Sequence, residues 1–349
     1  MYKLDLPYPP KAITDTTLKY FYIDTDLKAK MAADVLAKEE VICVDTETTG
    51  LEPHTNNLLL LQIGNPNGMY VVDVRKCHGG IFKPLLENPK TLKVLQNAIF
   101  DYKFLKYHLD INMANIYDTM LAELTLLSGS STNPREESGL EALCKKYLGI
   151  KIDKTIRKAF VGLPNSIDLA DRPELLLYAA LDVYYPEYIY KRQRERLIEN
   201  GLVSAAVIDF DLIPTISNME LRGIKIDQSL WTDILSSVRA DMYRLEKNVH
   251  MLVNKRRKQK ALWEDAPTVN LSSPVQLRRV LNECGIKVDD TSYDTLIRFL
   301  DDELIQKVLE YRGYERIMES FGTSVLDKIN KKTGCLHSDF NPLGAAHTG

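Results

Sequence analysis

VICVDTETTG, residues 41–50, is the stretch of sequence that decides the fold of the first half of this chain. Its first four residues are apolar and partly β-branched, which is typical of a buried strand. Because side chains alternate along a strand, Asp45 and Glu47 are expected on the same face. Two carboxylates in that arrangement repel each other, and a divalent cation bound between them would offset the repulsion. For this motif alone, the alternative is a strand that ends in a solvated acidic turn.

Short apolar runs on both sides of this stretch predict further strands. The predicted strands are Tyr20–Ile23, Val41–Val44, Leu58–Ile63, Met69–Val72 and Leu92–Leu95. Helical patterns alternate with them at Asp26–Glu39, Ile99–His108, Asp118–Leu127 and Leu140–Leu148. Asp26 is the expected N-cap of the first of these helices. The first half of the chain is therefore predicted to be a mixed α/β domain.

A second acidic motif, NAIFD, covers residues 97–101. Asn97 is expected to cap a helix, which places Asp101 one turn later. An aspartate in a first helical turn also interacts favourably with the helix dipole, and this is the alternative explanation for Asp101.

A third motif, YAALD, covers residues 178–182. Its spacing places the Tyr178 phenol and the Asp182 carboxylate on one face of a helix. Alternatively, Tyr178 is a core aromatic residue whose hydroxyl reaches the surface.

Taken together and in this order, VDTETTG, NAIFD and YAALD resemble the three motifs of the DnaQ-like, or DEDD, exonuclease superfamily. The tyrosine four residues before the last aspartate is similar to the subclass that carries tyrosine instead of histidine. The resemblance implies a ribonuclease H-like fold, in which helices flank a mixed sheet, and a 3′→5′ exonuclease activity. The implied catalytic residues are Asp45, Glu47, Asp101, Tyr178 and Asp182.

Four carboxylates carry four negative charges, which two divalent cations would neutralise. The resemblance implies two Mg²⁺ ions, for which Mn²⁺ can substitute, with Asp45 as the bridging ligand. Glu47 and Asp182 would complete one metal site, and Asp101 would act mainly at the other. Tyr178 is implied to orient the attacking water, since a phenol with a pKa near ~10 is a poor base at neutral pH.

The resemblance also implies contacts with DNA. Thr48 would touch the terminal nucleotide, Leu51 would wedge near the last bases, and Asn97 would help to hold the strand. The alternatives are a turn hydroxyl for Thr48 and ordinary core packing for Leu51. Asp118 also matches the family, and it is expected to be structural, as the cap of the next helix.

The second half of the chain is predicted to be mainly helical. Long amphipathic stretches occur at Pro173–Glu199, Leu202–Arg222, Gln228–Arg257, Pro274–Cys284 and Glu303–Ser320. The turn expected at Asn200 and Gly201 predicts a boundary. It divides the chain into an exonuclease domain at 1–200, a helical domain at 201–332 and a short segment at 333–349.

IPTISNMELRGIKID, residues 213–227, resembles the start of the thumb in family A DNA polymerases, the bacterial DNA polymerase I family. A helix ended by Gly223, a short strand, and Asp227 as the cap of the next helix are expected there. NLSSPVQL at 270–277, VLEYR at 308–312 and TGCLHSDFN at 333–341 also match, and the last is similar to the strand that leads into the palm. The resemblance implies the proofreading exonuclease and the thumb of such a polymerase, with DNA as the partner: a single-stranded 3′ end at the exonuclease and duplex at the thumb.

A dense basic run, Lys255-Arg256-Arg257-Lys258, lies within this second half and is followed by Trp263. Its position corresponds to the tip of the thumb in the family, where cations would contact the phosphates of duplex DNA. The alternative is a solvated helix end whose cations interact favourably with the helix dipole.

Composition sets limits on these hypotheses. The 349 residues suggest two domains, and a net charge of −3 gives no overall attraction to nucleic acid, so DNA contacts must come from local basic surface or bound metal. The five cysteines show neither disulfide nor zinc-site spacing. With no signal peptide or membrane span in the sequence, we expect a cytoplasmic protein.

The sequence stops at Gly349, before the palm and fingers motifs of the family. We therefore expect no polymerisation by this chain alone, and either a second chain that carries palm and fingers or a shortened polypeptide. Two other functions stay open: a free-standing exonuclease of the ribonuclease D type, and a noncatalytic DNA-binding or polymerase-assembly subunit.

Overall fold

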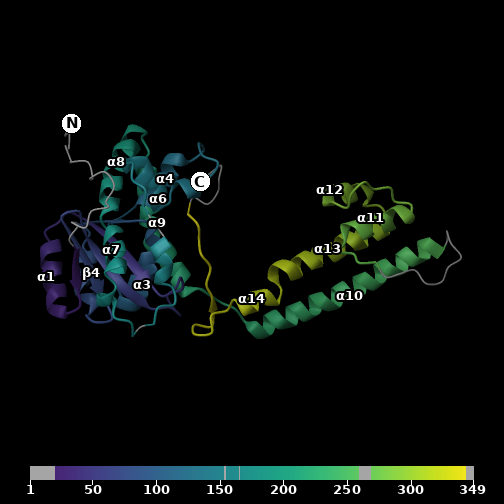
Figure 1. Ribbon diagram of the computed structural model, residues 1–349. Helices are drawn as coiled ribbons and strands as arrows, with labels where there is room; N and C mark the ends of the chain where they lie inside the picture. Colours follow the sequence, from purple (N-terminus) through teal and green to yellow (C-terminus); the bar gives the residue numbers. More distant parts are fainter. Residues whose placement is uncertain (1–19, 153–154, 165, 259–268, 343–349) are drawn as a thin grey trace. The chain divides into compact units, whose positions relative to one another are not determined.

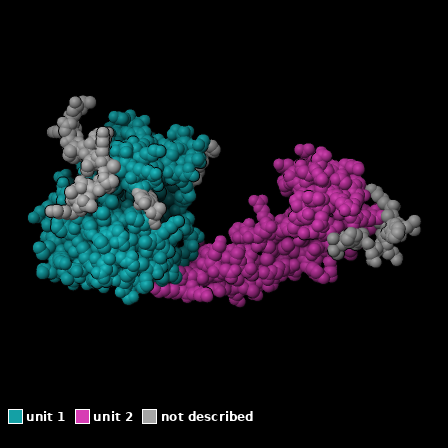
Figure 2. Space-filling view, in the orientation of Figure 1, with its two compact units in different colours: residues 1–223, 337–349 teal, residues 224–336 magenta. Residues whose placement is uncertain are grey.

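A computed structural model describes residues 20–152, 155–164, 166–258 and 269–342 (Figure 1). The chain divides into two compact units, coloured separately in Figure 2. Unit 1 comprises residues 1–223 and 337–349, and unit 2 comprises residues 224–336. Within the described part of the chain, no helix has both the length and the apolar character needed to cross a membrane.

Unit 1 is built on one six-stranded sheet in the order β1-β4-β3-β2-β5-β6. The strands are β1 (Tyr20–Ile23), β2 (Val41–Thr48), β3 (Leu58–Asn65), β4 (Gly68–Asp73), β5 (Leu92–Leu95) and β6 (Ile116–Asp118). β3 runs antiparallel to both β2 and β4, whereas the other neighbouring strands are parallel. The predicted mixed sheet is confirmed, and β6 is the strand that the sequence did not predict.

Helices flank this sheet on both faces (Figure 1). The helices of unit 1 are α1 (Asp26–Leu36), α2 (Lys83–Leu86), α3 (Ala98–Leu109), α4 (Thr119–Leu127), α5 (Pro134–Glu137), α6 (Leu140–Leu143), α7 (Pro173–Leu181), α8 (Tyr185–Glu199) and α9 (Val203–Arg222). Shorter helical turns occur at Gly79–Phe82, Cys144–Leu148, Thr155–Ala159 and Leu169–Asp171. α7 packs on β1, β2 and β4, and α8 packs on β2 and β5, while α3 contacts β2, β3 and β6. Burial of the apolar strands β2 and β3 between these helices is the main stabilising term of unit 1.

Two helix boundaries differ from those expected. The N-cap of α1 is Thr25, whose side chain accepts a hydrogen bond from the Lys28 N–H, so Asp26 lies in the first turn and is not the cap. The stretch predicted as one helix over Pro173–Glu199 breaks between α7 and α8. Pro186, in the first turn of α8, accounts for the break because its ring cannot be accommodated further inside a helix.

The division between the units lies beyond the turn at Asn200 and Gly201. That turn exists, and Gly201 has the positive φ of 68° that favours glycine. However, α9 follows it and packs on α3 and α4, burying Phe210 and Ile213. The compact part of unit 1 therefore continues to Gly223, 
where α9 ends, and not to the expected boundary at residue 200.

Unit 2 is mainly helical, as predicted. It contains α10 (Gln228–Lys258), α11 (Pro274–Glu283), α12 (Tyr293–Leu296), α13 (Glu303–Phe321) and α14 (Thr323–Asp327), with a helical turn at Ile297–Phe299. α10 and α13 pack lengthwise, and Val249, Val253 and Val308 are among the residues buried in this core. The short strands β7 (Ile224–Lys225) and β8 (Cys335–Leu336) pair antiparallel. The expected cap at Asp227 is present, since its carboxylate accepts from the Leu230 N–H at 3.0 Å.

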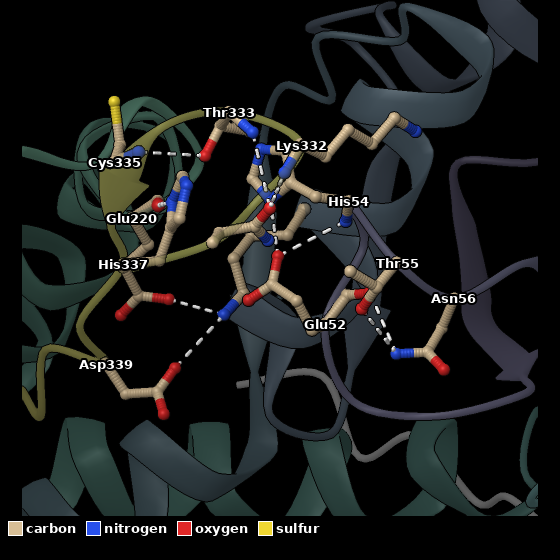
Figure 3. A network of polar contacts seen from close by, with 12 residues as sticks. Glu52, His54, Thr55, Asn56, Glu220, Lys332, Thr333, Cys335, His337 and Asp339 are labelled. Carbon is tan, nitrogen blue, oxygen red and sulfur yellow. Dashed lines mark hydrogen bonds and ion pairs between the residues drawn. The ribbon is translucent and has the colours of Figure 1, made fainter. Parts of the chain in front are cut away.

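The segment that follows β8 returns to unit 1, and Figure 3 shows its contacts. His337 Nδ1 lies 2.8 Å from the Glu220 carbonyl oxygen, and the Phe340 N–H donates to the Glu220 carboxylate at 2.6 Å. Glu220 is buried on α9, and the Lys103 ammonium of α3 pairs with it at 2.6 Å. The His337 ring also lies 4.2 Å from the ring of His54. These contacts tie residues 337–340 to α3 and α9.

Candidate active site

The five predicted catalytic residues line one cleft in unit 1, which has a volume of about 210 Å³. The cleft is lined by Asp45, Thr46, Glu47, Gln96, Asn97, Phe100, Asp101, Met120, Gly139, Leu140, Tyr178 and Asp182. They come from β2, from the segment that joins β5 to α3, from the start of α4, from the turn before α6 and from α7 with the residue after it. Residues distant in sequence thus meet where β2 ends.

Asp45, Glu47 and Asp182 form the most compact acidic group of the cleft. Each contributes a carboxylate oxygen, and these oxygens all lie within 4.8 Å of one another. Asp45 and Glu47 share one face of β2, and Asp182 directly follows α7, which covers that face. The described residues that line the cleft include no lysine, arginine or histidine. Hard oxygen ligands with no basic side chain among them suit Mg²⁺ or Mn²⁺.

Asp101 lies in the first turn of α3 and is 2 % exposed. It lines the same cleft but is not part of the compact group of three carboxylates. The Thr46 hydroxyl donates a hydrogen bond to Asp101 Oδ1 at 2.6 Å. The position of Asp101 is thereby coupled to the strand that carries Asp45 and Glu47.

Asp118, rather than Asn97, caps the helix that carries Asp101. Asn97 has a left-handed backbone with φ 64°, and its side chain makes no capping hydrogen bond, so the predicted cap is wrong. The Asp118 carboxylate accepts from the N–H groups of Asn97 and Ala98 at 3.1 and 2.7 Å. It also accepts from Met120 and Leu121, so one side chain caps both α3 and α4.

The expected structural role of Asp118 is thus confirmed and extended. Burial raises the pKa of this carboxyl, whereas the four backbone N–H groups favour its charged form. Loss of this carboxylate would leave two helix N-termini without their cap.

Tyr178 projects from α7 into the cleft, with its ring 6.4 Å from that of Phe160. The segment that leads into α7 is fixed to β4 and its following turn. Arg75 Nη1 donates to the Ile167 carbonyl at 3.0 Å, and Lys76 pairs with Asp168 at 2.6 Å. These contacts set the position of α7, and with it the positions of Tyr178 and Asp182.

The residues predicted to touch the 3′ end of DNA lie at or beside the cleft. Thr48 is buried, and its hydroxyl donates to the Gly50 carbonyl at 2.7 Å, as expected of a turn hydroxyl. Leu51 is 74 % exposed, which excludes the core-packing alternative. Asn97 is exposed and lines the cleft.

The basic run of unit 2 is partly neutralised by carboxylates of the same unit. Arg256 makes two hydrogen bonds of 2.9 Å to Asp302, and Arg257 Nε donates to Glu283 at 3.0 Å. Lys255 is exposed on α10. Trp263 and the side chain of Lys258 lie outside the described residues.

The sequence analysis did not single out several residues of the cleft wall. They are Gln96, Phe100, Met120, Gly139 and Leu140. Gln96 Nε2 donates to the Ser138 carbonyl at 2.9 Å and so holds the turn that carries Gly139. One signal could have identified Gln96: it directly follows a predicted parallel strand next to β2, and the carboxyl ends of parallel strands meet at one edge of a sheet.

Comparison with known proteins identifies this arrangement. The family of 3′-5′ exonuclease domains of A-type DNA polymerases matches residues 20–198. DNA polymerase I of Synechocystis sp. is 28% identical over 329 residues, which cover 85% of this chain and 31% of that protein. The chain thus spans between about a quarter and a third of the length of the first two curated relatives it matches, 26% and 31%.

Two solved structures share the fold. The POL domain of Pol1 from M. smegmatis, in complex with DNA primer-template and dNTP, has a TM-score of 0.66 and 16% identity, covering 93% of this chain and 53% of that one. Escherichia coli RNase D, an exoribonuclease involved in structured RNA processing, has a TM-score of 0.51 and 17% identity, covering 90% and 86%. The family match spans all three acidic motifs. The chain therefore belongs to the 3′-5′ exonuclease family of the A-type DNA polymerases, and it carries a DnaQ-like exonuclease domain.

Proposed function

We propose that the cleft of unit 1 hydrolyses the terminal phosphodiester of a DNA 3′ end and releases deoxynucleoside monophosphates, as the editing site of a family A DNA polymerase. The observation that carries this proposal is the meeting of Asp45, Glu47 and Asp182 within 4.8 Å, with Asp101 and Tyr178 in the same cleft. An acidic cleft without basic side chains would repel a phosphodiester unless cations were bound there.

Asp45, Glu47 and Asp182 would hold the divalent cations, with Asp101 completing the second site. The cations, when bound, supply charge stabilisation for an in-line displacement at phosphorus. Two ions match the four carboxylates in charge, and Mg²⁺ is the expected ion, with Mn²⁺ as its substitute.

The chain's own residues position the reactants. Tyr178 would orient the attacking water by a hydrogen bond from its phenol, because a phenol is too weak a base to take the proton at neutral pH. The exposed Leu51 would lie against the terminal bases, and Asn97 and Thr48 would contact the last nucleotide. Leu51 suits this role since 74 % of its apolar side chain is available for contact.

Two findings support DNA over RNA as the substrate. Identity with DNA polymerase I extends over 85% of this chain and so continues beyond the exonuclease domain. The long helical pair α10 and α13 of unit 2 fits a polymerase thumb, for which Lys255 would supply a phosphate contact. A noncatalytic DNA-binding or assembly role is disfavoured because all four carboxylates are present and line one cleft.

The substrate is tested with strands of one sequence, made as single-stranded DNA, single-stranded RNA, and primer-templates with a matched or a mismatched 3′ end. Each is incubated with Mg²⁺, with Mn²⁺ or with a chelator, and the products are resolved by length. We expect stepwise 3′ shortening of DNA, faster for the mismatched than for the matched primer, and none with chelator. Preferential degradation of RNA would instead support the ribonuclease D type of activity.

A further inference from the structure

Gln62 occupies an unusual place for a polar side chain. It lies in β3, where every residue is buried, and it is 0 % exposed. Neither its amide oxygen nor its amide nitrogen has a hydrogen-bond partner among the described residues. A buried amide without partners destabilises the fold, so an apolar residue of the same shape would be more stable there. Such a group calls for an explanation in function, bound water or bound ion.

The register of the sheet places Gln62 directly behind the acidic group. β2 and β3 are antiparallel, and Gln62 is the residue paired with Asp45. Residues directly opposite each other in an antiparallel pair project from the same face, with Cβ atoms about 4.5–5.5 Å apart. On its other side Gln62 is paired with Val71 of β4, which offers no polar group.

Gln62 is not among the residues that line the cleft, whereas Asp45 is. The amide is therefore close to Asp45 but on the side of the protein core. Carboxylates that bind metal ions are commonly held by such outer hydrogen bonds, which fix their orientation.

We propose that Gln62 is a positioning residue for Asp45: its amide N–H donates to the Asp45 carboxylate and holds it in the orientation that binds the divalent cation. This inference rests on the proposed metal-dependent function of the cleft. Side-chain rotation forms the bond, which the structure itself does not contain. An N–H donor suits the role because it leaves the negative charge of Asp45 in place.

The first test measures Mn²⁺ binding to the full chain by electron paramagnetic resonance, independently of nuclease activity. The variants are Gln62→Met, which is close in shape but apolar, and Asp45→Asn, which alters the ligand itself. Ser217→Ala is the matched control, since Ser217 on α9 is also fully buried with an unpartnered polar atom, and it is not among the residues that line the cleft.

We expect Gln62→Met to weaken Mn²⁺ binding by about 10-fold, in line with other outer hydrogen bonds to metal ligands, and Ser217→Ala to leave it unchanged. Both variants should keep or raise the thermal midpoint of the metal-free protein, because each removes a buried unpartnered group. Wild-type Mn²⁺ affinity in Gln62→Met would overturn the role of Gln62, while loss of binding in Asp45→Asn would still support the metal site. If the wild-type chain bound no Mn²⁺, the proposed function would fail first.

A second measurement does not depend on the folding of a variant. A crystal structure of the wild-type chain with Mn²⁺ should place Gln62 Nε2 within hydrogen-bond distance of Asp45, about 2.9 Å from a carboxylate oxygen. An amide that remains without contact to Asp45 in that structure would overturn the inference.

Discussion

The Thr46 hydroxyl donates a hydrogen bond of 2.6 Å to the Asp101 carboxylate, and both side chains are buried. Thr46 stands between Asp45 and Glu47, so strand alternation directs it to the opposite face of β2, the face on which α3 can meet it. One strand therefore carries two proposed metal ligands and, between them, the group that orients a third.

Thr46→Val is expected to lower the Mg²⁺-dependent exonuclease rate by about 10-fold, because valine keeps the shape of threonine but cannot orient Asp101. The dependence of the rate on Mg²⁺ concentration should shift upward as well. Thr46→Ser retains the hydroxyl and should stay close to the wild-type rate. Equal rates for Thr46→Val and the wild type would show that this hydrogen bond is not needed.

The buried ion pair between Lys103 and Glu220 should stabilise unit 1. Glu220 also accepts from the Phe340 N–H, so Glu220→Gln would leave the Lys103 ammonium poorly compensated. We expect the free energy of unfolding to fall by about 3 kcal/mol. Far-ultraviolet circular dichroism during denaturation measures this loss for the whole chain, including unit 1, whereas both tryptophans, Trp231 and Trp263, belong to unit 2.

The control for Glu220→Gln is Asp24→Asn, which removes the exposed pair between Asp24 and Lys28. Exposed pairs contribute little, so this variant should change stability by less than about 1 kcal/mol. Similar small losses for both variants would contradict a stabilising role for the buried pair.

Lys93 should make the stability of unit 1 depend on alkaline pH. Its side chain is fully buried and donates to the carbonyls of Asn88 and Thr91 at 2.6 and 2.7 Å. Burial lowers the pKa of this amine to about 8. Above this value the unfolded chain binds more protons than the folded one, so stability rises with pH until the unfolded amine also loses its proton near pH ~10.4.

From pH 8 to pH 10, this one amine should contribute an increase of about 2 kcal/mol in the free energy of unfolding. Lys93→Met removes the titration, so the difference between wild type and variant isolates it from the tyrosines. Parallel pH profiles for the two proteins would show that Lys93 keeps its ordinary pKa.

The basic run of unit 2 should not act as a uniform DNA-binding surface. Lys255 is exposed, so Lys255→Ala should lower the slope of log affinity for duplex DNA against log salt by about 1. Arg256 pairs with Asp302, whose carboxylate also caps α13 through the Leu304 N–H at 2.9 Å. Arg256→Ala should therefore mainly lower the stability of unit 2, which tryptophan fluorescence can follow. An unchanged salt slope in Lys255→Ala would favour the alternative of a solvated helix end.

Much of the fold was predictable because unit 1 follows simple rules of periodicity. Five of its strands are uniform apolar runs, and the α3 and α4 helices were expected within one or two residues. β6 escaped because it has only three residues and its Asp118 was interpreted as a cap. The boundary was expected too early because α9 shows no local sign in sequence that its partners are α3 and α4.

The acidic residues of the site were predictable because their spacing reflects the elements that carry them. The wall of the cleft was not, since Gly139 and Leu140 reach it only through tertiary contacts such as that between Gln96 and Ser138. Gln62 was missed for a similar reason. A single polar residue inside the apolar run of β3 does not show that its neighbour in the sheet is Asp45.

The most direct test of the central claim compares the wild-type chain with the double variant Asp45→Ala, Glu47→Ala on 3′-labelled single-stranded DNA. The measurement is the rate at which labelled mononucleotide is released with and without Mg²⁺, with circular dichroism as the check on folding. Wild type should release label only with the metal, and the folded double variant should lose at least about 1,000-fold in rate, because both ligands on β2 are gone. Release at the wild-type rate by the folded double variant would contradict the assignment of this cleft as the exonuclease site.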